Sequence, residues 1–378
     1  MSETVALLKH LVAIASVNPD LVPGGAGEGR IADACAAWLA DHGFEVHRLE
    51  KRPGRPSIVG VAKGRGGGRS LMFNGHIDTV TLAGYDGDPL APVIRDGKLH
   101  GRGAFDMKGG VAAMMVAAAR ASQDRVAGDI LVACVADEEY ASTGTAEVVE
   151  HFTADGAIVT EPSHLELTIA HKGFIWFDVT VKGRAAHGSR PELGIDAIVK
   201  AGKFLAALED YDRRLRAVPR HPILKTGSVH ASLIKGGEEL SSYPAECRIS
   251  LERRTIPGET TAIVTAELQA LVDAIRAGDP QFSATIAPGL ERAPFEIGED
   301  EPIVATLDDV ATVRLGRKAA RRGEPFWTDC AILQGAGIPC VMFGADGAGA
   351  HAATEWTSVE SLERLTDILA ETARRFCA

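Results

Sequence analysis

The sequence predicts an α/β fold in which a sheet domain is interrupted by a second, inserted domain. Two observations carry this prediction. Short apolar runs that end in acidic residues or histidine alternate with helical segments through residues 1–172. From residue 173 to 288 the expected order is strand, helix, strand, strand, helix, strand, which is the ferredoxin-like βαββαβ unit. We therefore predict a sheet domain formed by 1–172 and 289–378, with 173–288 as the insertion.

The first elements are two helices, at 3–16 and 28–42, where apolar residues recur at helical spacing. Two short strands are expected at 44–49 and 57–62. The glycine-rich segment 63–69 lacks the GKS or GKT ending of a phosphate-binding loop and precedes a strand. We interpret it as a hairpin turn.

The first strongly apolar strand, 70–74, is followed by Gly75, His76, Ile77 and Asp78. Residues two apart in an extended backbone point the same way, so His76 and Asp78 can meet on one side of the chain. That pairing suits a metal-binding imidazole whose second ring nitrogen is held by a carboxylate. The same triplet also arises by chance, and its meaning depends on the residues that converge with it.

A glycine-rich segment, GRGAFDMKGG at 101–110, contains a single carboxylate, Asp106. It is too rich in glycine for regular helix or strand, and a helix of small residues is expected directly after it, at 108–121. We interpret the segment as a loop that places Asp106 at the start of that helix. The alternative is a solvated aspartate that only complements the helix dipole.

A second apolar strand, at 129–136, ends in Asp137, Glu138 and Glu139. Three consecutive acids at the end of a buried strand are costly if they face the interior unpaired. They therefore either lie in solvent or are compensated by a cation.

Two more apolar strands end in the same way. Glu161 follows the strand at 156–160, and a glycine-rich loop with His351 follows the strand at 338–343. In an open α/β sheet the ligand site lies beyond the carboxyl ends of the strands. We therefore expect two histidines and several acids from separate segments to converge at one edge of the sheet. The insertion explains why His351 lies so far from the others along the chain.

Zinc accepts imidazole nitrogen and carboxylate oxygen, and two such ions about 3.5–4 Å apart can share one carboxylate. The predicted ligands are His76 and Glu161 for one ion, Glu139 and His351 for the other, and Asp106 as the bridge. Glu138 is then left without a ligand role and is the candidate general base, while Asp78 orients His76. Cobalt or manganese would suit the same ligands.

The inserted segment is predicted to hold four strands and two helices. In chain order these elements are 174–181, 193–209, 225–234, 245–251, 260–277 and 282–287. The arginine-rich segment 210–222 is expected to be a solvated loop.

The 378-residue chain carries a net charge of -11. This argues against nucleic acid or an anionic membrane as a partner, because either requires a basic surface. No apolar run is long enough to cross a membrane, and the N-terminus lacks the pattern of a signal peptide. The six cysteines form no CxxC pair, so we expect buried, reduced thiols in a cytoplasmic protein.

Together these motifs resemble those of the co-catalytic zinc hydrolases that include acetylornithine deacetylase, succinyl-diaminopimelate desuccinylase, aminoacylase and the glutamate carboxypeptidases. The matching segments occur in order over almost the whole chain. They are GHID at 75–78, GRGAFDMKGG at 101–110, DEE at 137–139, TEPS at 160–163, RAAHGSRPELGIDAI at 184–198, the segment 236–247, RRTIPGE at 253–259 and GAHAATEW at 349–356.

The resemblance implies that the inserted domain is a lid and the dimerisation domain of a homodimer. His187 matches the histidine that polarises the scissile carbonyl, the alternative being a polar loop histidine. Arg254 matches an arginine that holds the substrate carboxylate, and a lid arginine in a salt bridge is the competing interpretation. Ser241 stands where the family presents an asparagine to the substrate, and a hydroxyl cannot make the same pair of hydrogen bonds.

The predicted function is metal-dependent hydrolysis of the amide bond of an N-acyl amino acid. A hydroxide between the two ions would attack the carbonyl, and Glu138 would shuttle the proton. Glu161 favours a deacylase, because the family's peptidases tend to carry aspartate at the matching position. A carboxypeptidase or dipeptidase with the same two-metal site is the nearest alternative. A non-catalytic binding module is disfavoured, because every ligand candidate and the base are present.

Overall fold

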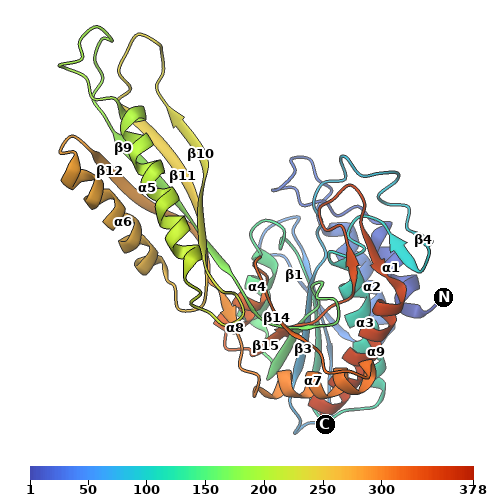
Figure 1. Ribbon diagram of the computed structural model, residues 1–378. Coiled ribbons are helices and arrows are strands. Elements are labelled where there is room, and N and C mark those ends of the chain that lie inside the picture. The colour runs from blue at the N-terminus through green and yellow to red at the C-terminus, as the bar shows by residue number, and fades with distance from the viewer. The chain divides into compact units, whose positions relative to one another are not determined.

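The structure, a computed structural model that describes residues 1–378, divides into two compact units (Figure 1). The first unit comprises Met1–Ile169, Ile297–Arg322 and Thr328–Ala378, and the second comprises Ala170–Glu296 and Gly323–Trp327. The predicted α/β class, with an antiparallel βαββαβ segment inserted in the chain, is confirmed.

A nine-stranded mixed sheet has the order β1-β2-β6-β3-β7-β15-β8-β13, and β14 also pairs with β8. The strands are β1 (Glu45–Leu49), β2 (Ser57–Ala62), β3 (Leu71–His76), β6 (Ile130–Val135), β7 (Gly156–Val159), β8 (Leu167–His171), β13 (Phe295–Glu296), β14 (Arg321–Glu324) and β15 (Cys340–Met342). Its four central neighbours, β6, β3, β7 and β15, run parallel to one another. Their carboxyl ends therefore lie at one edge of the sheet.

The glycine-rich segment 63–69 is not a hairpin turn, contrary to the prediction. β2 pairs with β6 in antiparallel orientation, and β3 pairs with the other side of β6, so β2 and β3 are not neighbours. The physical reason lies in β6, whose residues are all buried and apolar. An all-apolar strand is typical of the interior of a sheet whose two faces are covered, and β6 accordingly has a strand on each side.

Helices pack on the central strands in two groups (Figure 1). One group contains α3 (Lys108–Gln123), α7 (Pro302–Leu315) and α9 (Val359–Phe376), with α1 (Glu3–Val12) against α3, and α2 (Gly29–Asp41) packs on β1 and β2. The other group contains α4 (Thr143–His151) and α8 (Cys330–Gly335), which contact each other as well as β6 and β15, respectively. None of these helices, nor any other in the chain, combines the length and apolar character needed to cross a membrane. All six cysteines are buried, free thiols.

A small sheet that was not predicted joins two distant parts of the first unit. Its order is β16 (Gly347–Ala348), β17 (Trp356–Ser358), β5 (Lys98–His100) and β4 (Val93–Arg95). The pairing of His100 with Trp356 holds the segment before Asp106 beside the loop that carries His351.

The second unit has the order β9 (Gly173–Lys182), α5 (Ala197–Ala217), β10 (Ser228–Gly236), β11 (Glu246–Thr255), α6 (Thr261–Gly278) and β12 (Ser283–Arg292). Its antiparallel sheet runs β10-β11-β9-β12, and both helices pack on it around one apolar core. The unit extends past residue 288, where the insertion was expected to end, because β12 stays paired with β9 as far as Arg292.

The prediction of a loop over 210–222 is wrong for its first part, since α5 continues to Ala217. Tyr211 and Leu215 extend the apolar stripe of α5 into the core of the second unit. The intervening arginines lie outward, and Arg216 pairs with Asp212 one turn earlier. Burial on one face and ion pairs on the other therefore prolong the helix.

Candidate metal centre

The first unit brings together the histidines and acids that the sequence singled out. The carboxyl ends of three parallel strands and two loops supply them. His76 ends β3, Glu138 and Glu139 follow β6, Glu161 follows β7, Asp106 precedes α3, and His351 lies between β16 and β17.

Asp106 occupies the middle of this cluster. Its Oδ1 lies 3.2 Å from Nε2 of His76, and its Oδ2 lies 3.3 Å from Nε2 of His351. A glutamate approaches the same ring nitrogen of each histidine: Glu161 Oε1 is 3.5 Å from His76 Nε2, and Glu139 Oε2 is 3.0 Å from His351 Nε2. The structure thus brings His76 together with Glu161 and His351 together with Glu139, and Asp106 contacts both histidines.

Glu138 lies at the same site. Its carboxylate forms a group with His76 and Glu161 in which the possible ligand atoms all lie within 4.8 Å of one another. A second such group contains His76, Asp106 and Glu139. The predicted base is therefore within reach of the residues that could hold a cation.

His76 contacts Asp78 through Nδ1. Nδ1 of His76 lies 3.0 Å from the backbone oxygen of Asp78 and 3.5 Å from its carboxylate Oδ1. The predicted contact between the two residues is present, with the backbone oxygen as the nearer partner. Nε2, the other ring nitrogen, faces Asp106 and Glu161.

The glycines of the GRGAFDMKGG segment allow Asp106 to approach the sheet. A Cβ on Gly110 would lie 2.1 Å from the backbone oxygen of Thr160, so only glycine permits the start of α3 to pack on the end of β7. Thr160 directly precedes Glu161, and this contact therefore holds the loop of Asp106 close to Glu161. The peptide bond between Asp106 and Met107 is cis.

Burial and crowding raise the pKa values of the glutamates. Burial, reinforced by the charge of Glu161, raises the pKa of Glu138 well above its usual range. Burial and then the charge of Asp106 raise the pKa of Glu139, and burial does the same for Glu161. The site therefore holds more buried negative charge than its histidines neutralise.

The pKa values of the two histidines are raised as well, because carboxylates surround them. Hydrogen bonding to Asp106 and then to Glu139 raises the pKa of His351 to about 10. Burial lowers the pKa of His76, but nearby carboxylates, with Glu161 first, outweigh it and the net shift is upward. Both imidazoles thus compensate carboxylates, which is the role that a cation would take over.

The donor set fits divalent ions. It consists of imidazole nitrogens and carboxylate oxygens, which zinc accepts. Oε1 of Glu139 is buried and has no hydrogen-bond partner. A buried acceptor of this kind needs a compensating group, and a cation among these ligands would supply it.

Two charged residues that support the site were not assigned a role from the sequence. Glu355 is only 1% exposed, and its Oε1 accepts the backbone N–H groups of Phe105 and Asp106. Its Oε2 accepts the N–H of Gly103 and a hydrogen bond of 2.9 Å from Arg102. In the sequence, both residues could have been noticed because each is a charged residue within a matching motif, Arg102 in GRGAFDMKGG and Glu355 in GAHAATEW.

The remaining predicted residues belong to the second unit. His187 is exposed, and its Nδ1 accepts the backbone N–H of Ser189 at 3.2 Å. The N–H of the next residue, Gly188, donates to the backbone oxygen of Ser241 at 2.7 Å. The structure therefore places the loop of His187 against the segment of Ser241.

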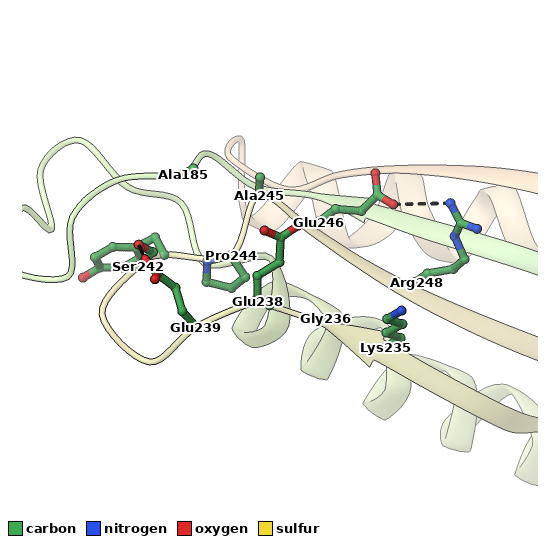
Figure 2. A pocket seen from close by; sticks show the side chains of 12 residues that line it. Ala185, Lys235, Gly236, Glu238, Glu239, Ser242, Pro244, Ala245, Glu246 and Arg248 are labelled. Carbon is green, nitrogen blue, oxygen red and sulfur yellow. Dashed lines mark hydrogen bonds and ion pairs between the residues drawn. The ribbon is translucent and has the colours of Figure 1, made fainter.

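A surface pocket of about 520 Å3 lies beside this segment (Figure 2). Five of its twelve lining residues are charged, among them Lys235, Glu238 and Arg248, and Ser242 and Tyr243 also line it. The pocket lies within the second unit.

Arg254 has partners within its own unit. Its Nε donates to Oε1 of Glu252 at 2.7 Å, and its guanidinium lies 5.3 Å from the centre of the Phe174 ring. The structure thus shows the salt bridge of the competing interpretation. Binding of a substrate carboxylate by Arg254 stays a prediction.

Comparison with known proteins agrees with this geometry. The model of "Peptidase family M20/M25/M40" matches residues 72–375. An acetylornithine deacetylase from Myxococcus xanthus is 31% identical, and the match covers 100% of this chain and 99% of that protein. An N-formyl-4-amino-5-aminomethyl-2-methylpyrimidine deformylase from Bacillus subtilis is 28% identical, over 100% of this chain and 95% of that protein.

A solved structure described as a dinuclear metal-binding peptidase from Bacillus subtilis has the same fold. Its TM-score is 0.76 at 17% identity, with 99% of this chain and 97% of that chain covered. The resemblance inferred from the sequence motifs is confirmed by the extent of the family match. The chain belongs to peptidase family M20/M25/M40, whose members are metal-dependent hydrolases that act on amide bonds as deacylases or peptidases.

Proposed function

We propose that the chain hydrolyses the amide bond of an N-acyl amino acid and that the reaction depends on two divalent ions. The observation that carries this proposal is the position of Asp106, whose two oxygens each face a different histidine. A carboxylate shared in this way is the ligand that a two-ion centre requires. Two such ions, when bound, polarise a carbonyl oxygen and lower the pKa of a coordinated water.

The residues that would hold the ions form two sets. His76 and Glu161 would hold one ion and His351 and Glu139 the other, with Asp106 shared. This set of two imidazoles and three carboxylates suits zinc, and cobalt or manganese would also be accepted. The buried, unpartnered Oε1 of Glu139 supports a cation at this position.

Glu138 is the proposed general base. Its carboxylate lies with His76 and Glu161, and burial together with the charge of Glu161 raises its pKa. A carboxylate with a raised pKa takes the proton of the attacking water more readily and then delivers it to the leaving nitrogen. The backbone oxygen of Asp78 contacts Nδ1 of His76, and this contact keeps Nε2 directed at the ligand cluster.

Three residues of the second unit are proposed to act on the substrate. His187 would polarise the scissile carbonyl, because its Nδ1 accepts an N–H and a proton on Nε2 is free to be donated. Arg254 would exchange its partner Glu252 for the substrate carboxylate. Ser241 would contact the substrate through its hydroxyl.

Two relatives support a deacylase, since the names deacetylase and deformylase both describe removal of an acyl group. A carboxypeptidase or dipeptidase is the second candidate, because the matching family model is that of a peptidase family. The test is hydrolysis by the zinc-loaded protein of N-acetyl, N-formyl and N-succinyl amino acids, N-acetylornithine among them, and of dipeptides. A chelated sample is the control. Cleavage of dipeptides alone would replace the proposal by its alternative, and activity that survives chelation would refute the metal dependence.

A homodimer through the second unit is also proposed. β10 lies at the edge of its sheet, so one side of its backbone has no neighbouring strand within the unit. Leu233 and Ile234 on this strand are 70% and 56% exposed. A second copy could add its own β10 about a twofold axis and cover both side chains.

The dimer is tested by light scattering of Leu233→Glu. We expect this variant to be monomeric, because a charge at a buried strand pairing is unfavourable. Val313→Glu is the matched control, since Val313 is also 70% exposed but lies on α7 of the first unit. A monomeric wild-type protein would refute the dimer.

A further inference from the structure

One buried amide side chain contacts two carboxylates that stand directly behind the candidate metal centre. Asn18 is fully buried in the segment after α1. Its Nδ2 donates to Oδ2 of Asp78 at 2.8 Å and to Oδ1 of Asp137 at 3.0 Å. Its Oδ1 accepts the backbone N–H groups of Asp20 and Leu21. Only an oxygen can accept these two bonds, so the amide nitrogen necessarily faces the carboxylates.

The first of these carboxylates, Asp78, serves several parts of the site at once. Besides its contacts with His76, it accepts the backbone N–H of Glu138 through Oδ1 and that of Glu139 through Oδ2, both at 3.2 Å. A rotation of this carboxylate would therefore disturb the imidazole and the turn that carries Glu138 and Glu139 together.

The second carboxylate, Asp137, begins that turn. Its φ of 70° is left-handed, a conformation that residues other than glycine adopt rarely. Its side chain is held by Asn18, by Thr143 at 2.7 Å and by Arg55 at 2.9 Å. The buried guanidinium of Arg55 is in turn held by Glu28. These contacts stabilise the backbone just before Glu138.

Charge explains why a neutral donor is needed between the two acids. Arg55 contacts Asp137 and Glu28, whereas Asp78 contacts His76, Asn18 and backbone N–H groups. Two buried carboxylates repel each other, and an amide that donates to both offsets this repulsion without adding charge. An apolar side chain at position 18 would leave both acids short of a donor.

We propose that Asn18 is a positioning residue of the metal centre. It acts through Asp78 and Asp137, and it sets the direction of His76 and of the turn that presents Glu138 and Glu139. This inference rests on the proposed function, because it assumes that His76 and Glu139 bind cations.

The test compares Asn18→Ala and Asn18→Ser with a control that loses one buried hydrogen bond elsewhere in the first unit. Thr4→Val is that control, since Thr4 and Thr366 share a buried hydrogen bond of 3.1 Å between α1 and α9. The readouts are the Kd for cobalt, the absorption spectrum of the cobalt-loaded protein, the melting temperature of the metal-free protein, and kcat and KM.

Loss of a residue behind metal ligands weakens metal affinity or activity by about 10- to 100-fold. For Asn18→Ala we expect a loss of this size in cobalt affinity, an altered cobalt spectrum, and a kcat that falls while KM changes little. Asn18→Ser retains one donor and should lie between Asn18→Ala and the wild type. If Asn18→Ala does not fold, Asn18→Ser tests the same prediction. Thr4→Val should lower the melting temperature while leaving the cobalt spectrum and kcat unchanged.

The inference is overturned if a folded Asn18 variant binds cobalt with the wild-type Kd and spectrum. Failure of the proposed function is distinguishable from this result. If the wild type binds cobalt but cleaves no amide, the substrate proposal fails and the role of Asn18 is still decided by the metal readouts. If the wild type binds no cobalt, both proposals are wrong.

Discussion

The backbone N–H of Asp106 donates to Oε1 of Glu355 at 3.0 Å, although the two residues are far apart in the chain. The same buried carboxylate accepts N–H groups from Gly103 and Phe105 and pairs with Arg102. Arg102 also donates to the backbone oxygen of Ala352, next to His351. Glu355 and Arg102 therefore hold the Asp106 loop and the His351 loop in one fixed arrangement.

Replacement of Glu355 by glutamine should destabilise the protein. An amide cannot accept all of these N–H donors, and Arg102 would be left buried without its partner charge. We expect a loss of about 2–4 kcal/mol in the free energy of unfolding, measured by urea denaturation of the metal-free protein. Glu360→Gln, which breaks an exposed pair with Arg364, should change it by less than about 0.5 kcal/mol. Equal effects of the two substitutions would contradict this role for Glu355.

Glu138→Gln should remove turnover while sparing the metal ions. Glutamine has nearly the same shape as glutamate but cannot take a proton, and general base catalysis contributes about 10²–10⁴ in rate. Steady-state kinetics and elemental analysis of the same preparation provide the measurement. Glu150→Gln, at an exposed glutamate paired with Lys51, is the control. Full activity in Glu138→Gln would show that the proton is moved by another group.

Asp106→Asn and Glu161→Gln should differ in how many ions they lose. Asp106 faces both histidines, so its substitution should weaken both ions together. Glu161 contacts only the His76 side, so Glu161→Gln should weaken one ion more than the other. Isothermal titration with zinc measures both stoichiometries. If Asp106→Asn kept one ion at wild-type affinity, Asp106 would not be the bridge.

Removal of metal should lower the melting temperature. Without cations the buried carboxylates of Glu138, Glu139 and Glu161 repel one another, and burial already raises their pKa values. At a metal concentration 100-fold above Kd, binding adds about 2.7 kcal/mol to the free energy of unfolding. This corresponds to roughly 5–10 °C for a domain of this size. Differential scanning calorimetry with and without chelator tests it, and an unchanged melting curve would indicate an empty site.

An acid-sensitive ion pair in the second unit gives a pH prediction away from the metal centre. Hydrogen bonds from Lys200 and then Lys203 lower the pKa of Asp279 from 3.8 to about 2. A lowered pKa in the folded state means that the charged form stabilises the fold above pH 4, and this contribution disappears as the pH falls from about 4 to about 2. The difference in urea midpoint between wild type and Asp279→Asn should therefore shrink over that range. If the difference in urea midpoint did not change with pH, titration of Asp279 could not be its cause.

Patterns of local sequence were sufficient for the sheet strands that carry the site. β3, β6 and β7 are short apolar runs. β3 ends at His76, the acids lie just after the end of β6 at Val135, and β7 ends shortly before Glu161. A run buried on both faces is visible in composition alone, and parallel neighbours place their carboxyl ends at one edge. The βαββαβ order of the second unit was visible for the same reason.

Local sequence failed where a segment's conformation depends on what packs against it. The segment 63–69 does not form a hairpin turn because β6, far along the chain, pairs between β2 and β3. The helix α5 continues to Ala217 because Tyr211 and Leu215 are covered by the core of the second unit. The strands β5 and β17 are three residues long, and only pairing with each other and with β4 and β16 makes them strands.

The sequence by itself therefore determined the fold class, the residues that meet at the sheet edge and their division into two sets of candidate ligands. Tertiary structure alone decided which buried groups support those ligands: Asn18 behind Asp78, Arg55 behind Asp137, and Glu355 behind Asp106. The physical reason is that a ligand residue reveals itself by its chemistry and its place after a strand. A supporting residue is an ordinary polar side chain until burial removes its water and leaves a distant carboxylate or backbone group as its partner.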